Sequence, residues 1–307
     1  VVRITVTGGS KIHTLTVDED VDIGRIRFVD GSAAILKVDT GCTLEADSIT
    51  GLGYLWVADG AMFYVDSTLN ATSLKNDGTV VKRVASDVSI PVNNDSTGTT
   101  IVNSGTLKVL SHIGNDTAHK IRVVSGATFD MNGVQDVTAN VVLENGATFA
   151  NNGNEIDAET KQTVSLTLEG NATAEFSNNF GLIGPSYGET TLALGSNTLT
   201  LNGSRKDFWL CNTEITGDGT IYVEHGWLHP TKTASVGNNC TLNIPLGGAL
   251  NLEANLTVAN FVNSTKSGNI KGSSILTFYA EALGQVVLCT SFSLPIEVII
   301  GLSCCIG

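Results

Sequence analysis

The stretch that decides the fold is TLALGSNTLTLNG (191–203), and two variants of it follow, TGDGTIYVEHGWLHP (216–230) and GNNCTLNIPLGGALNL (237–252). Each segment places a Gly or Asn turn before a short run in which apolar and polar residues alternate. Alternation over about four to six residues is typical of a β-strand, because successive side chains point to opposite faces. A strand this short cannot bury its apolar face alone. Each copy therefore needs a similar copy stacked on it.

The same unit recurs along most of the chain. Most of the recurrences are spaced about 20 to 25 residues apart, which is the length of one turn of a parallel β-helix. The sequence therefore predicts an all-β fold, a right-handed parallel β-helix (β-solenoid), with the hand expected from the crossovers between parallel strands. The glycines that precede the alternating runs are Gly31, Gly41, Gly60, Gly78, Gly105, Gly126, Gly146, Gly170, Gly195, Gly219 and Gly247.

Three segments also resemble a known family: VVSGATFDMNG (123–133), LENGATFANNG (143–153) and GDGTIYVEHGWL (217–228). They are similar to the passenger repeats of bacterial autotransporters and related surface proteins, whose passengers are right-handed parallel β-helices. The resemblance covers roughly residues 15–280. It implies the fold and an extracellular or cell-surface location, but passengers include adhesins, enzymes and inert stalks. The autotransporter membrane barrel is not found before Gly307, so we do not expect self-secretion through an outer membrane.

Composition and charge exclude several classes of protein. The net charge of −13 disfavours nucleic acid, which requires a basic stripe, and also disfavours an anionic membrane surface. We expect a β-solenoid over residues 1–280, with a weak boundary near 86–104 where turn residues cluster. Residues 281–307 are apolar and hold half of the cysteines, but they are too interrupted for a membrane span. We interpret them as a C-terminal cap or an assembly segment.

The six cysteines are candidates for disulfides, because an even number and an Asn- and Thr-rich surface fit an oxidising compartment. Cys211 and Cys240 are separated by slightly more than one coil, so we expect them on neighbouring rungs. Cys289 with Cys304 or Cys305 is a second candidate, and it leaves Cys42 and one tail thiol for bonds between subunits. Scattered buried thiols are the alternative, and spacing alone does not fix the pairing.

Acidic residues at alternate positions, Asp18, Asp20 and Asp22, are the one weak candidate for a metal site, with Ca²⁺ as the ion. The calcium loop of helix–loop–helix proteins needs Gly directly after the third acidic position, where this chain has Ile23. A solvated strand face is the favoured interpretation. We expect no cofactor and no catalytic residue.

Two further segments hold residue types that occur in active sites. SRKDFWL (204–210) gathers a basic residue, a carboxylate and an indole, a mixture with which β-helix polysaccharide lyases and hydrolases hold sugars. No matching carboxylate is recognised one coil away, so an exposed turn is favoured. His225, Trp227 and His229 alternate, so both histidines are expected on one face, where a third ligand would complete a zinc site.

Three functions remain open. The first is a secreted structural protein that self-assembles into an extracellular fibre, sheath or surface layer. The second is a cell-surface adhesin or stalk of the autotransporter-passenger type, with surface glycans as partners. The third is a carbohydrate-active β-helix enzyme. Self-assembly is expected to use apolar strands at the two ends of the chain, whose residues are Val2, Ile4, Val6, Val298, Ile299 and Ile300.

Overall fold

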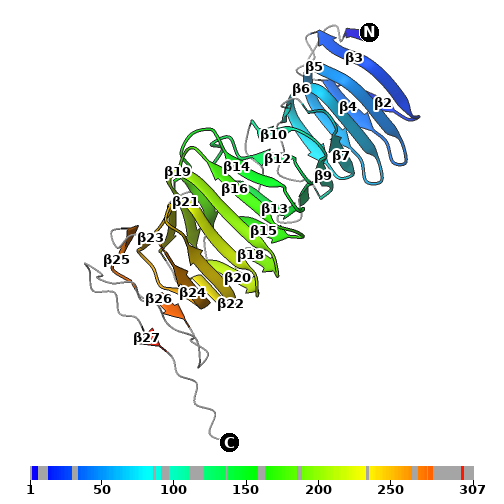
Figure 1. The fold of residues 1–307 in the computed structure, drawn as a ribbon. Coiled ribbons are helices and arrows are strands. Elements are labelled where there is room, and N and C mark those ends of the chain that lie inside the picture. Colours follow the sequence, from blue (N-terminus) through cyan, green and yellow to red (C-terminus); the bar gives the residue numbers. More distant parts are fainter. Residues whose placement is uncertain are drawn as a thin grey trace, which may run out of the picture.

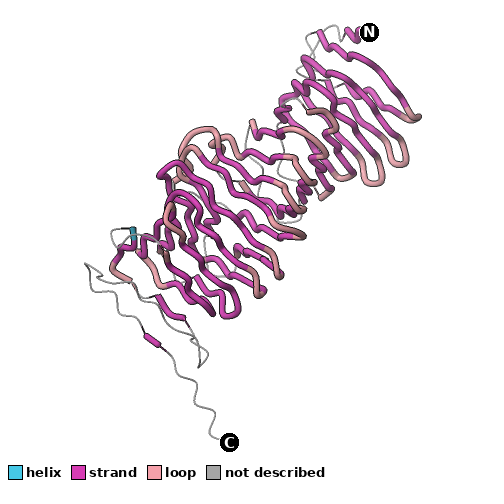
Figure 2. Tube along the Cα trace, viewed as in Figure 1, coloured by secondary structure: helices cyan, strands magenta, loops and turns pink. Residues whose placement is uncertain are grey.

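In the computed structural model, short parallel strands wind into a β-solenoid of about 10 turns, with residues 2–5 and 276–278 at opposite ends (Figure 1). The structure describes residues 2–5, 13–29, 34–85, 88–90, 97–110, 120–135, 137–157, 163–184, 189–232, 235–264, 269–274, 276–278 and 299–300. Within these residues there is no α-helix, and the short cyan segment in Figure 2 is a single residue, Asn269, in 3₁₀ conformation. The predicted all-β parallel solenoid is confirmed.

The strands are numbered β1 to β27 in chain order. Strands β1 to β9 are Val2–Thr5, His13–Val17, Val21–Val29, Ala34–Val38, Thr43–Val57, Met62–Asn76, Thr79–Lys82, Val88–Ile90 and Thr99–Val102. Strands β10 to β18 are Thr106–Val109, Lys120–Val123, Thr128–Asp130, Thr138–Leu143, Thr148–Asn151, Thr163–Leu168, Ala172–Phe176, Phe180–Ile183 and Thr190–Gly195. Strands β19 to β27 are Thr198–Cys211, Thr213–Gly217, Thr220–Thr231, Ser235–Ile244, Gly248–Leu252, Leu256–Asn263, Ile270–Gly272, Leu276–Phe278 and Ile299–Ile300.

Stacked strands form three rows, which we name row A, row B and row C by their order along each turn. Long strands such as β5 bend through the corners and contribute to all three rows. Row A contains β2, β4 and the ends of β5 and β6, and later β17, the ends of β19 and β21, β23 and β25. Row B includes β7, β9, β11, β13, β15, β18 and β20. Row C includes β1, β8, β10, β12, β14 and β16.

Register between turns repeats at about 20 to 25 residues, as the spacing of the glycines predicts. Phe129 pairs with Phe149, and Val141 pairs with Leu166. Strand β9 pairs with β7 on one side and with β11 on the other, so row B is continuous through residues 99–102. The weak boundary expected near 86–104 stays a prediction.

Glycine fixes the corners of several turns. The amide N of Ala127 donates to the carbonyl O of Val124 at 3.0 Å, and Ala147 donates to Glu144 in the same way at 3.0 Å. The residue before each donor is glycine, Gly126 with φ 75° and Gly146 with φ 78°. A β-turn whose third residue has positive φ favours glycine, because other side chains are strained there. The recurring Gly signal in the sequence is therefore a turn signal.

One apolar core runs along the inside of the solenoid, from Val17 to Leu276. Inward residues alternate with outward ones, as in β4, where Ala34, Leu36 and Val38 are buried. Phenylalanines from rows A and C stack in the middle of this core. Phe180 in row A is fully buried. The centroid of its ring lies 5.1, 5.4 and 5.3 Å from the ring centroids of Phe149, Phe176 and Phe208.

The residues expected to drive assembly lie near the two ends. Val2 and Ile4 are in β1, which pairs with β3. Ile299 and Ile300 form β27 and pair with Thr277 and Phe278 of the same chain. At these two positions the tail therefore extends its own solenoid. Two more of the predicted assembly residues, Val6 and Val298, lie outside the described residues.

Candidate functional site

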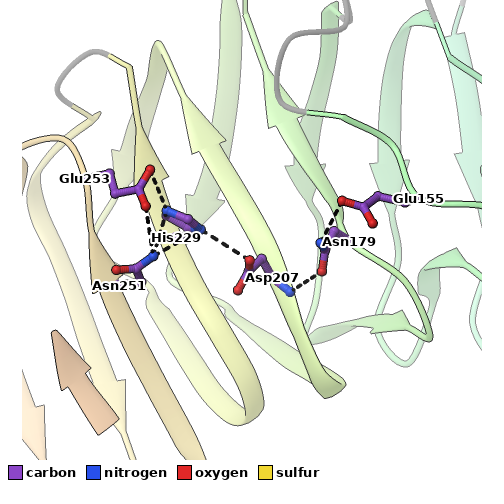
Figure 3. Close-up of polar contacts among 6 residues, drawn as sticks. All are labelled: Glu155, Asn179, Asp207, His229, Asn251 and Glu253. Atoms are coloured by element: carbon purple, nitrogen blue, oxygen red, sulfur yellow. Dashed lines mark hydrogen bonds and ion pairs between the residues drawn. The ribbon is translucent and has the colours of Figure 1, made fainter. Parts of the chain in front are cut away.

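Row A carries a cluster of polar and aromatic side chains in the C-terminal half of the solenoid, which we call the His229 cluster. It consists of Glu155, Asn179, Asp207, Trp209, His229, Asn251 and Glu253. These residues come from successive turns, and Figure 3 shows six of them in a line along the row. The strands that position them are β19, β21 and β23, because Trp209 pairs in register with His229 and the next turn brings Asn251 alongside.

His229 is at the centre of the cluster. Its imidazole Nδ1 lies 3.4 Å from Asp207 Oδ2, and its Nε2 lies 3.2 Å from Glu253 Oε2. The amide N of Asn251 lies 2.9 Å from the same Nε2 and donates to Glu253 Oε1 at 3.3 Å (Figure 3). The side chain of His229 is only 5% exposed, whereas the carboxylates of Asp207 and Glu253 are 26% and 55% exposed. The imidazole is thus held between two carboxylates that face solvent.

Neighbouring contacts fix the two ends of the cluster. The backbone amide of Asp207 donates to Asn179 Oδ1 at 2.9 Å, and Asn179 Nδ2 donates to Glu155 Oε1 at 2.9 Å. The ring of Trp209 packs on the imidazole of His229 with centroids 4.2 Å apart. Its indole Nε1 is buried and has no hydrogen-bond partner among the described residues. A buried donor without a partner costs free energy, so this edge of the cluster is not optimised for stability alone.

A second indole lies on the same row. Trp227 pairs with Asp207 on the preceding turn, and Lys271 Nζ is 4.4 Å from the centre of the Trp227 ring. A cation over an aromatic ring is electrostatically attracted to its face. The row therefore presents carboxylates, an amide, an indole and an ammonium group within a few turns of the solenoid.

Sequence reasoning found part of this cluster. No carboxylate was recognised one coil from the SRKDFWL segment, and the structure places Glu253 two coils on, where it meets His229, which in turn meets Asp207. Arg205 and Lys206 do not join Asp207 in the His229 cluster. The ladder between β19 and β21 shifts register between Asn202 and Asp207, so the intervening residues leave the ladder. Arg205 has φ 59° and lies in a separate small pocket with His225.

The two histidines do not share a face. His225 pairs with Asn202 at the end of row C and is exposed, whereas His229 pairs with Trp209 in row A and is buried. Within the described part of the chain, no group of three His, Cys, Asp or Glu residues is arranged to hold a metal ion. The weak calcium candidate is exposed at Asp18, Asp20 and Asp22, and Asp20 Oδ1 accepts a hydrogen bond from the amide N of Thr43 at 2.8 Å.

The cysteines that the structure describes form no disulfide: Cys42, Cys211 and Cys240. Cys211 ends row A in its turn and pairs in register with Thr231. Cys240 instead precedes Thr241, which pairs with Thr220. The two cysteines are therefore not register partners, although their spacing had suggested that they would be. Burial raises the pKa of the Cys240 thiol to about 11. Cys289, Cys304 and Cys305 lie outside the described residues.

Arginines elsewhere on the surface act as clamps between turns. Arg83 binds both Asp66 and Glu45 and lies over the ring of Tyr64, with its Cζ 4.2 Å from the ring centre. The hydrogen bonds that Arg83 donates to Asp66 are the main reason that the pKa of Arg83 is raised. Arg122 likewise binds Glu144 and Glu169, at 2.7 and 2.6 Å. These bonds join side chains from successive turns and do not form a site.

No helix in the described part of the chain is long and apolar enough to cross a membrane. Comparisons with protein families, with curated proteins and with solved structures found no match. The autotransporter resemblance thus rests on the quoted repeats alone.

Proposed function

We propose that the protein is a cell-surface binding stalk, a β-solenoid that displays a carbohydrate-binding face on row A. The observation that carries this proposal is the His229 cluster, in which two solvent-facing carboxylates flank a buried imidazole on a regular sheet. Side chains held by mutual hydrogen bonds lose little conformational freedom when a ligand binds, which favours affinity. The resemblance to autotransporter passengers supports the same class of function and an extracellular location.

The chemistry of the face matches the hydroxyl groups and apolar ring faces of sugars. Asp207 and Glu253 are acceptors for hydroxyl donors, and the Asn251 amide offers both a donor and an acceptor. The indole of Trp227 offers a flat apolar surface with partly exposed area. A few polar groups that fix orientation beside an aromatic surface are typical of small-molecule sites.

Calorimetric titration of the full chain with a panel of neutral oligosaccharides tests the proposal. Asp207→Asn and Glu253→Gln remove a charge with little change of shape, so each is expected to weaken binding at least about tenfold, the effect of losing one charged hydrogen bond. Glu214→Gln is the matched control, because Glu214 is exposed on row B. The proposal would be refuted if the chain bound no oligosaccharide. It would also be refuted if Asp207→Asn and Glu253→Gln bound with the same affinity as the control Glu214→Gln.

Self-assembly into a fibre, sheath or surface layer is the second candidate, and one observation favours it. Leu15 in β2 is 39% exposed, whereas its register partner Leu36 on the next turn is fully buried. Apolar surface and strand edges of this kind drive association of solenoid ends. Leu15→Glu and deletion of residues 284–307 should both reduce a concentration-dependent mass in sedimentation. A monomeric full-length chain at high concentration would exclude this function.

A carbohydrate-active enzyme is the third and least supported class, and we expect no catalysis. The test is incubation with acidic polysaccharides. Release of unsaturated sugars that is abolished by Arg205→Ala would contradict this expectation.

A further inference from the structure

A groove with a volume of about 920 Å³ opens on row C near the N-terminal end of the solenoid, and two arginines line it. Arg25 and Arg27 lie in β3 on either side of the buried Ile26. Residues two apart on a strand point to the same face, so the two Cα atoms are roughly 7 Å apart. Both side chains are exposed. We name this feature the arginine groove.

These arginines differ from the clamping arginines described above. Arg83 and Arg122 each bind two carboxylates. Arg25 and Arg27 form no hydrogen bond or ion pair with any other residue that the structure describes. In a chain with a net charge of −13, two neighbouring unpaired arginines are unusual. Guanidinium groups of this kind are the preferred partners of carboxylate, sulfate and phosphate oxygens.

The strand register places hydroxyl groups beside the two arginines. Arg25 pairs with Ser48 and Arg27 pairs with Thr50 on the next turn. Asp47 and Ser67 also line the groove.

We propose that the arginine groove binds an acidic sugar unit of a polysaccharide. The guanidinium groups would pair with its carboxylate or sulfate. Ser48, Thr50 and Ser67 would exchange hydrogen bonds with its hydroxyl groups, and Asp47 would accept from them. Nucleic acid fits less well, because Asp47 lies in the groove and the rest of this acidic chain repels a long polyanion. This site is separate from the His229 cluster and does not rest on the function proposed there.

Titration of the full chain with trigalacturonate, its methyl ester, a sulfated trisaccharide and a short DNA duplex tests the inference. The acidic sugars should bind more tightly than the uncharged ester. Arg25→Gln and Arg27→Gln should each weaken that binding about tenfold or more, since each removes a charged hydrogen bond. Raising the salt from low concentration to about 0.5 M should also weaken binding. Preference for the carboxylated or the sulfated sugar identifies which anionic group is the natural one.

Lys120→Gln is the matched control, because Lys120 is an exposed cation at the start of β11 on another row. It should bind the acidic sugars as the unaltered chain does. Equal affinity for the acid and the ester overturns the inference. Unchanged affinity in the Arg25→Gln/Arg27→Gln double variant, tighter binding to DNA, or no binding to either acidic sugar also overturns it.

Discussion

Phe180→Ala tests whether the phenylalanine stack holds consecutive turns together. Phe180 is fully buried in β17. Its ring packs on the rings of Phe149, Phe176 and Phe208, with centroids 5.1 to 5.4 Å apart. Replacing a buried Phe by Ala costs about 3–5 kcal/mol, through lost apolar burial and the cavity left behind. Each aromatic pair adds about 0.5–1.5 kcal/mol. We therefore expect a cost of about 4–5 kcal/mol, at the upper end of the range.

Hydrogen exchange measured residue by residue is the appropriate assay. Solenoid stability is a sum of local terms between neighbouring repeats, so one global unfolding free energy does not report a local change. A cost of about 4 kcal/mol corresponds to roughly a thousandfold faster opening. This loss of protection should be confined to the turns around β16, β17 and β19. Amides of β4 and β7, several turns away, should exchange as before.

Leu246→Ala is the control, because Leu246 is 65% exposed and its removal should cost less than about 0.5 kcal/mol. If Phe180→Ala increases exchange no more than this control does, the stack does not stabilise the solenoid. If instead every amide of the chain loses protection equally, the turns unfold as one unit and the local description is wrong.

Three further predictions concern packing and titration. A Cβ atom on Gly203 would lie 2.0 Å from the ring of Phe176, so Gly203→Ala should cost about 1–3 kcal/mol by overpacking, measured by hydrogen exchange of the amides in β16 and β19 against the unaltered chain. A hydrogen bond from Lys37 lowers the pKa of Asp39 below its ordinary value, so Asp39 adds stability above the ordinary pKa of an aspartate and loses it as the pH falls. In Lys37→Met the Asp39 pKa should rise, as NMR titration would show. Because burial raises the pKa of Cys240 to about 11, the native thiol should react with iodoacetamide at pH 8 at least about a hundredfold more slowly than in urea; equal rates would contradict its burial.

Much of the fold could be predicted because its signals are local. Alternation in segments such as 198–203 places Leu199 and Leu201 inward, and both are fully buried. Positive-φ turns favour glycine, so the residue type itself marks corners such as Gly41 and Gly60. The aromatic residues of alternating runs follow the same pattern of inward and outward positions. Phe63 is in the core, and Trp56 lies outside between Lys37 and Lys75.

The His229 cluster could not be predicted to the same degree, because it depends on register across turns. Asp207, His229 and Glu253 are separated by roughly one turn each, but turn length varies along the chain. A search at one fixed spacing therefore misses Glu253. One signal in the sequence could have indicated the contact. Asn251 and Glu253 are polar residues that lie one coil after His229, at the end of an alternating run.

Register shifts explain why both candidate sites lie where they do. Around the His229 cluster, the β19–β21 ladder shifts between Asn202 and Asp207, so Arg205 leaves the ladder while Asp207 enters row A. Beside the arginine groove, the β5–β6 ladder shifts between Ala46 and Ser48. A β-bulge bends a strand and re-aims its side chains, and bulges are frequent beside functional sites. Regular turns of this solenoid place outward residues in repeated columns. An irregular turn is what brings unlike side chains together and opens space beside them.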